Sequence, residues 1–511
     1  MFAKHILKGR RPTARMDNQR MSNVFLGGIS LSILLGLGLS VASAAEPAAP
    51  PPPIHAPLPT PPPEAPVDPA SFPPLPPIDD PSPLGLGVQR TMTLLATSTP
   101  KHRNHVRVLF YGQSITEQEW SKQVAEDLRK RFPDADLEIE NRAIGGFAAQ
   151  LLIRPAEHDL YPFYPDLVIF HVFGANQQYE QIIKSIRSRT TAEVLMQLDR
   201  VGAKWPQTQP DEKADKGLWW DYLMNHRFLP DIAKKYGCGL EDVRSGWMRY
   251  LNDNHYEPGQ LLLKDGAHLN PQGNFLLAQL TDRYLVYRPD LPDTQWKDLT
   301  HDYTLADGDW KDGKLSVEFE GNRVDVIPAR EKTAGGTARV LIDGKKPSEF
   351  PGAYRITRPQ PGPWNPVFLS RVDHDAPLVL EEWTLKLKDV SPDAKTWAFD
   401  VTGSVTGPDG SGRSDQPFAS NSGRVKIDPA AWFRGFNPPL PNGYTIHWKV
   451  LPMFVDGYQV PKIDDPAKEN ATVVVQGIPN GKHLLEIIAD DASTPPAIGV
   501  VRTYKPPVKA E

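Results

Sequence analysis

The sequence predicts an α/β domain followed by a β-rich region. Between about residues 84 and 292, apolar strand-like runs alternate with helical apolar stripes. From about residue 293 to 511, apolar and polar residues alternate with a period of two, and hairpin-type turns recur. Repeated strand-helix units favour a parallel sheet with helices on both faces, a three-layer arrangement, whereas period-two segments favour antiparallel strands. A length of 511 residues agrees with two or three domains.

The N-terminal segment resembles an export signal. Several basic residues precede an apolar run from Val24 to about Val41, and residues 42–44 form the small-residue pattern of a signal-peptidase site. We expect residues 1–45 to be a signal peptide that directs the protein to the periplasm, the cell envelope or the outside. A retained membrane anchor is the alternative, because the run approaches the roughly 20 residues that span a bilayer. Proline dominates residues 46–83, which predicts an extended linker.

Apolar spacing defines the elements of the α/β region. It predicts four strands, at residues 106–111, 137–140, 166–173 and 193–198. The third is almost wholly apolar, as is typical of a central parallel strand. Helical spacing of apolar residues predicts a helix from Trp120 to Phe132 and another from Tyr179 to Ile186. A long helical region is expected at about 218–236, and a last helix at about 271–287.

The region from 293 to 511 has the pattern of antiparallel strands. Asp343-Gly344, Asn442-Gly443 and Asn480-Gly481 are typical of hairpin turns. We expect a sandwich-like or jelly-roll-like region. In this prediction, about 300–361 and 466–505 form a split jelly roll, and about 362–465 form an inserted β domain. Three tryptophans of this region, Trp310, Trp364 and Trp432, fit either a carbohydrate-binding surface or the filling of a core.

Ser114 is the candidate nucleophile. It follows the first predicted strand and begins the next helix, within the segment Gly112-Gln113-Ser114-Ile115-Thr116. Open α/β sheets present their catalytic groups at the carboxyl ends of strands, which is where this hydroxyl is expected. Serine is a weak nucleophile alone, so it needs a base.

The segment Asp265-Gly266-Ala267-His268 supplies that base. An imidazole can both take the serine proton and return it to a leaving group. Asp265 can turn back within the same loop and accept a hydrogen bond from the other ring nitrogen of His268, which fixes the tautomer. The sequence therefore predicts an acid-base pair within one turn.

Acyl transfer also requires donors for the oxyanion of the tetrahedral intermediate. The backbone N–H groups of Ser114 and Gly146 and the side-chain amide of Asn176 each follow a predicted strand. Parallel strands bring their carboxyl ends to one edge of the sheet, so we expect these three groups to converge there.

Taken together, these segments resemble the SGNH (GDSL-type) hydrolases. Residues 112–116 are similar to the first block of that family, 141–146 to the second, 174–176 to the third and 265–268 to the fifth. The resemblance covers roughly residues 106–287 and implies a flavodoxin-like fold. It also implies that Ser114, Gly146, Asn176 and His268 are the four residues that name the family, with Asp265 as the triad acid.

The sequence departs from the family pattern at two positions. Gln113 and Gln177 stand where aspartates are usual. Neither of those aspartates is the catalytic acid, so the predicted triad is complete, but hydrogen bonding around the nucleophile must differ. Gln113 and His171 are candidates for lining the pocket, although a buried, hydrogen-bonded core histidine is the more common role for a residue such as His171.

The sequence suggests no metal or cofactor. No histidine, cysteine or carboxylate cluster has metal-ligand spacing, and no glycine loop is built to hold a phosphate. Cys238 is the single cysteine, which excludes an intrachain disulfide. The net charge of −5 argues against a nucleic-acid partner.

These observations predict an exported serine esterase that removes acetyl groups from a polysaccharide or cell-wall glycan, or acts on a small ester. Association with the cell envelope fits the linker and the export signal. Two alternatives stay open at this point. The same residues would serve a polysaccharide O-acetyltransferase, and a glycan-binding or scaffold protein could carry an inactive copy of the domain.

Overall fold

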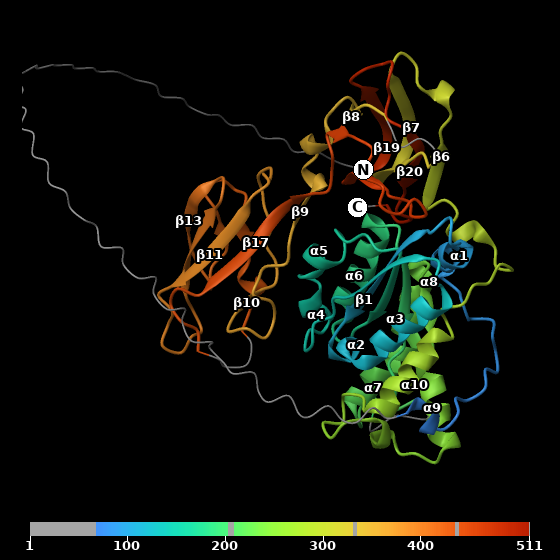
Figure 1. Cartoon of the computed structure of the whole chain (residues 1–511). Coiled ribbons are helices and arrows are strands. Elements are labelled where there is room, and N and C mark those ends of the chain that lie inside the picture. The colour runs from blue at the N-terminus through green and yellow to red at the C-terminus, as the bar shows by residue number, and fades with distance from the viewer. Residues whose placement is uncertain (1–67, 203–208, 331–334, 435–438, 510–511) are drawn as a thin grey trace, which may run out of the picture. The chain divides into compact units, whose positions relative to one another are not determined.

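A parallel sheet of five strands forms the centre of the α/β domain (Figure 1). Its strands are β1 (His105–Gly112), β2 (Asp136–Asn141), β3 (Leu167–His171), β4 (Glu193–Gln197) and β5 (Gly239–Glu241), in the order β2-β1-β3-β4-β5. Every neighbouring pair is parallel. The chain order reverses between β1 and β3, and open α/β sheets bind their ligands at the carboxyl ends of strands beside such a point.

The computed structural model describes residues 68–202, 209–330, 335–434 and 439–509. The predicted signal peptide at 1–45 and most of the predicted linker therefore lie outside the described residues. Within the described ranges, no helix combines the length and apolar character needed to span a bilayer.

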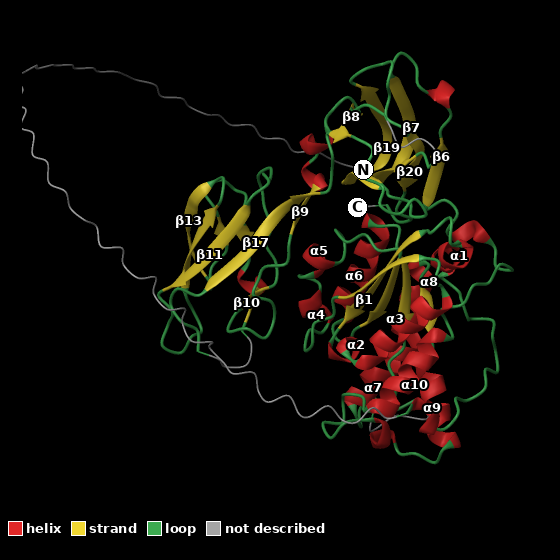
Figure 2. Ribbon diagram, in the orientation of Figure 1, coloured by secondary structure: helices red, strands yellow, loops and turns green. Residues whose placement is uncertain are grey.

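Helices cover both faces of the sheet, which confirms the predicted three-layer arrangement (Figure 2). Successive side chains of a strand point to opposite faces. Phe110 and Ile169 therefore join one core, and Leu109 and Phe170 join the other. The first core is covered by α1 (Gln89–Thr97), α3 (Glu119–Arg131), α9 (Val243–Asp253) and α10 (Pro271–Asp282), and the second by α4 (Ala149–Leu152), α5 (Ala156–Asp159), α6 (Asn176–Arg189) and α8 (Leu229–Tyr236).

The described part of the proline-rich segment lies along this domain. The ring of Phe72 packs against that of Phe275, with 5.3 Å between centroids. The carbonyl of Pro76 accepts a hydrogen bond from Arg283 at 2.7 Å. Residues 68–83 thus pack on α9 and α10, although their composition predicts an extended linker. A few aromatic and aliphatic side chains suffice to anchor such an extended chain.

The β-rich region contains two larger antiparallel sheets. One has six strands in the order β18-β8-β19-β7-β20-β6, and the other has five in the order β13-β12-β11-β17-β9. The first consists of β6 (Thr300–Thr304), β7 (Lys314–Pro328), β8 (Ala338–Ile342), β18 (Gly457–Tyr458), β19 (Thr472–Ala489) and β20 (Ile498–Tyr504), and the second of β9 (Tyr354–Ile356), β11 (Glu382–Lys388), β12 (Ala398–Gly403), β13 (Gly407–Arg413) and β17 (Thr445–Pro452).

One turn expected from the sequence is absent. Asn480-Gly481 lies inside β19, where the pairing of β19 with β7 shifts register between Gln476 and Gly481. A bulge accommodates the same flexible dipeptide that a hairpin would use, and local sequence alone does not separate the two.

Two short strands of the β-rich region reach the core of the α/β domain. They are β10 (Phe368–Leu369) and β16 (Trp432–Phe433), which pair with each other. Phe368 is fully buried, and the ring of Phe147 packs against Phe368 and Phe433 with centroid distances of 5.9 and 4.8 Å. Beside them, Arg358 forms a 2.6 Å ion pair with the buried Asp159 of α5. This contact holds part of the β-rich region next to the loop that follows β2.

Candidate active site

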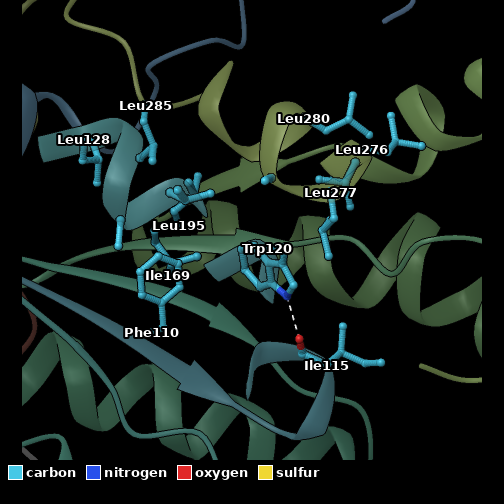
Figure 3. Packing of buried hydrophobic residues seen from close by; sticks show 14 of the residues in the cluster. Phe110, Ile115, Trp120, Leu128, Ile169, Leu195, Leu276, Leu277, Leu280 and Leu285 are labelled. Atoms are coloured by element: carbon cyan, nitrogen blue, oxygen red, sulfur yellow. Dashed lines mark hydrogen bonds between the residues drawn. The ribbon is translucent and has the colours of Figure 1, made fainter. Parts of the chain in front are cut away.

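Ser114 begins the four-residue helix α2 (Ser114–Glu117) directly after β1. The carbonyl of Gln113 accepts the N–H of Thr116 at 2.8 Å, which closes the first turn. Beneath it, the indole N–H of Trp120 donates to the carbonyl of Ile115 at 2.6 Å (Figure 3). Trp120 is itself fully buried against Phe110. The turn that carries the candidate nucleophile therefore rests on a packed core.

The loop after β2 is bound to this turn. Asn141 donates its side-chain N–H to the carbonyl of Thr116 at 2.6 Å. The carboxylate of Glu117 accepts the N–H of Gly145 at 2.8 Å. A Cβ placed on Gly145 would lie 3.4 Å from the Cβ of Ser114, and Gly146 next to it has a φ of +73°. The candidate oxyanion glycine is thus held beside Ser114 in a conformation that glycine adopts readily.

Asn176 is brought to the same loop. It begins α6, two residues after Gly174, whose φ is +124°. A Cβ on Gly174 would lie only 2.8 Å from the Cβ of Ala148, so this close approach requires glycine. The carbonyl of Phe173 also accepts the N–H of Ala149 at 3.0 Å. These contacts join the loops after β2 and β3.

Asp265 and His268 form the expected pair. The Nδ1 of His268 and a carboxylate oxygen of Asp265 are 2.6 Å apart. The other carboxylate oxygen accepts the backbone N–H groups of Ala267 and His268, each at 2.9 Å. The N–H of Ala267, the His268 ring and the N–H of His268 hold the pKa of Asp265 well below its usual range. Asp265 therefore remains ionised and favours the tautomer of His268 with its proton on Nδ1.

Gln118 connects the serine turn to the histidine loop. Its side-chain oxygen accepts the N–H of Leu269 at 3.0 Å, and its side-chain N–H donates to the carbonyl of Leu269 at 3.1 Å. Leu269 follows His268 directly, and Gln118 lies one turn after Ser114. The sequence analysis did not identify Gln118, because its partner is 151 residues away in the chain and no local pattern marks it.

No known protein-family profile and no curated protein matches the sequence. Solved structures do. One is a two-domain esterase active on acetylated mannans, at 15% identity and a TM-score of 0.32, over 83% of this chain and 97% of that chain. A second is the acetyl xylan esterase AlAXEase, at 22% identity and a TM-score of 0.31, over 35% of this chain and 100% of that chain. A third is a GDSL-like lipase from Parabacteroides merdae, at 14% identity and a TM-score of 0.29, over 36% of this chain and 98% of that chain.

The structure places His171 in the core, with 5% of its surface exposed. Its Nε2 lies 2.6 Å from a carboxylate oxygen of Asp199, which follows β4. The next residue, Arg200, donates to the carbonyl of Ala267 in the histidine loop. His171 thus belongs to the support beneath the site, whereas Gln113 is half-buried at the start of the nucleophile turn.

Metal ligation finds no support in the part of the chain that the structure describes. No group of three or more histidine, cysteine, aspartate or glutamate side chains is placed there to hold an ion. Burial raises the pKa of Cys238 to about 11, which makes its thiolate a minor species near neutral pH.

Proposed function

We propose that the protein is a serine esterase with Ser114 as nucleophile, His268 as general base and Asp265 as the triad acid. One observation carries the proposal. The ionised Asp265 orients His268, and Gln118 fixes the loop of that pair to the turn of Ser114. The loops of Gly146 and Asn176 add support, because the N–H of Gly145 bonds to Glu117 of the Ser114 turn and the N–H of Ala149 bonds to the carbonyl of Phe173.

Acylation and then deacylation of Ser114 follow from this arrangement. Nε2 of His268 takes the hydroxyl proton while Oγ of Ser114 attacks the ester carbonyl carbon. The N–H groups of Ser114 and Gly146 and the amide of Asn176 stabilise the oxyanion. The carbonyl–alkoxy bond then breaks, and the imidazolium returns its proton to the departing alcohol. Water, deprotonated by His268, attacks the acyl-serine, releases the acid and restores Ser114.

The finer proposal is that the ester is an acetyl group on a glycan. It rests on the resemblance to SGNH hydrolases, on the predicted export signal and on the β-rich region. Acetate released from an acetylated polysaccharide is the expected product. Acetyl groups transferred to an added oligosaccharide, without free acetate, would instead identify an O-acetyltransferase with the same residues.

The test of the esterase is Ser114→Ala. We expect ester hydrolysis to fall by at least about 10³-fold, because loss of a triad member removes that much or more. Labelling by a fluorophosphonate probe should disappear, and thermal unfolding should change little. Ser188→Ala is the matched control, since Ser188 lies in the last turn of α6 and bonds only weakly to the Ser185 carbonyl, at 3.5 Å. Full activity or full labelling of Ser114→Ala would refute the proposal.

Export is a separate proposal. It rests on residues 1–45, which lie outside the described part of the chain. The mature protein should begin just after residue 44 or 45, as read by N-terminal sequencing of protein from the native host. An intact N-terminus in the membrane fraction would indicate a retained anchor instead.

A further inference from the structure

Trp364 lies directly against the candidate oxyanion glycine. A Cβ placed on Gly146 would be 3.0 Å from Cη2 of Trp364 and 3.5 Å from its Cζ2. The edge of the indole is therefore in close contact with the turn that holds the Gly146 N–H. Trp364 comes from the β-rich region, yet it borders the site that the α/β domain builds.

The indole is held in place by an aromatic series. Its ring meets that of Phe433 edge-on, with 6.4 Å between centroids and an interplanar angle of 89°. Phe433 in turn packs on Phe147, which follows Gly146 directly. The backbone of Trp364 has a φ of +74°, an uncommon conformation for a bulky residue. This conformation and these contacts set the ring beside the site.

Trp364 differs from the other candidate tryptophans in its exposure. It is 44% exposed. Trp310 and Trp432, in contrast, are partly buried and pack against the cores of the β-rich region. Burying an indole normally stabilises a protein, so a half-exposed one at the edge of a candidate active site is better suited to cover part of a ligand.

Charged side chains bond to the loop of Gly146, which this exposed indole borders. The carboxylate of Glu117, which is itself exposed, accepts the Gly145 N–H, and Arg358 donates to the carbonyl of Arg142 at 3.2 Å. A long acyl chain would need a continuous apolar groove. A sugar ring instead presents an apolar face of C–H groups and a rim of hydroxyls, which matches one aromatic platform with polar neighbours.

We propose that Trp364 is a pyranose-binding subsite, on which the sugar that carries the ester stacks while its acetyl group lies at Ser114. The β-rich region then supplies part of the substrate site. This inference rests on the proposed esterase function. It assigns the alcohol side of the substrate to the indole of Trp364, whose edge borders Gly146.

The experiment compares two substrates in the full-length protein. One is a fully acetylated manno- or xylo-oligosaccharide, and the other is 4-nitrophenyl acetate, which has no sugar. In Trp364→Ala, the ratio of kcat/KM for the oligosaccharide to kcat/KM for the aryl ester should fall by about 10- to 100-fold, the range for loss of one large aromatic contact. Trp364→Phe should retain most of the ratio. Trp310→Ala, at a tryptophan that packs against the core of the six-stranded sheet, should leave the ratio unchanged.

Binding gives an independent readout. Non-acetylated oligosaccharides are titrated into the Ser114→Ala protein, with and without Trp364→Ala, and followed by tryptophan fluorescence and calorimetry. Weaker binding on loss of Trp364 supports the subsite. An unchanged substrate ratio, or equal binding by both proteins, would overturn it. If the wild type hydrolyses neither substrate, the esterase proposal fails, and the titration alone then decides the subsite.

Discussion

At the scale of single residues, the candidate site depends on side chains that join distant segments. Gln118 makes two hydrogen bonds to the backbone of Leu269, as a neighbouring strand would. Arg200 donates to the carbonyl of Ala267 in the same loop. The exposed His268 loop therefore takes its position from its neighbours as well as from its own turn.

Replacing Gln118 should reduce turnover without abolishing it. In Gln118→Ala, we expect kcat to fall by about 10- to 100-fold, because a displacement of about 1 Å between reacting groups costs that much. The effect should be mainly on kcat for aryl acetate, with little change of KM. Gln123→Ala, at a half-buried glutamine further along α3, is the control. A Gln118 variant with wild-type kcat would show that the loop keeps its position unaided.

The motif residues could be predicted from the sequence because their chemistry follows the strand ends. Ser114 follows the end of β1, Gly146 lies in the loop after β2, Asn176 begins the helix after β3, and Asp265 and His268 share one turn. The residues that fix them could not be predicted. Gln118 bonds to Leu269, 151 residues away in the chain, and a single sequence does not record which distant segments meet.

At the scale of elements, the short strand β5 shows how a strand escapes sequence analysis. It has three residues, too few for a periodic pattern, and pairs with β4 through Gln197 and Glu241. Longer strands such as β1 were predicted almost to the residue. Glu241 is completely buried, and its carboxyl accepts the side-chain N–H of Gln197 at 2.8 Å.

This buried carboxyl should make stability depend on pH. Burial raises the pKa of Glu241 to about 8, whereas a glutamate in the unfolded chain has a pKa near 4.5. Between these values the folded state holds a proton that the unfolded state lacks. The contribution of Glu241 to stability is therefore greatest below pH 4.5 and is lost as the pH rises toward 8. Glu241→Gln should remove about 2 kcal/mol of the loss between pH 5 and pH 7.

Urea unfolding at the two pH values measures this effect. Glu126→Gln on the exposed side of α3 is the control and should keep the wild-type dependence. An equal dependence in Glu241→Gln and the wild type would show that the carboxyl titrates normally in the folded protein.

At the scale of the whole molecule, the contact between the α/β domain and the β-rich region contains a buried histidine. Nδ1 of His158 is 3.1 Å from the carbonyl of Ile356, and its Nε2 accepts the N–H of Val372 at 3.1 Å. Both bonds require the neutral ring, with its proton on Nδ1. The Arg358–Asp159 ion pair and the buried Phe368 lie at the same contact.

Acid should therefore weaken this contact. Burial lowers the pKa of His158 to about 4, below the value of 6.5 for an exposed histidine. The unfolded state then binds more protons between these values. The contribution of His158 to stability is therefore fully present above about pH 6.5 and falls as the pH decreases toward 4. The loss from pH 7 to pH 5 should be about 2 kcal/mol.

His158→Gln can keep both hydrogen bonds without titrating, so its first unfolding transition should lose less stability than that of the wild type over the same pH interval. Thermal scans at pH 7 and pH 5 compare the two. His226→Gln, at an exposed histidine, should behave as the wild type. If His158→Gln and the wild type lose the same stability, protonation of His158 does not limit the contact.

The six-stranded sheet has a consequence for synthesis of the protein. β7 lies between β19 and β20, and its Lys314 is 172 residues from its ion-pair partner Glu486 in β19. At translation rates of about 5–20 residues per second, a ribosome needs roughly 10 to 30 s to make the missing strand. During that time β7 has unpaired edges, and such edges recruit other chains. The nascent polypeptide must therefore be shielded, by a chaperone or by its own folded α/β domain, until the last tenth of the chain emerges.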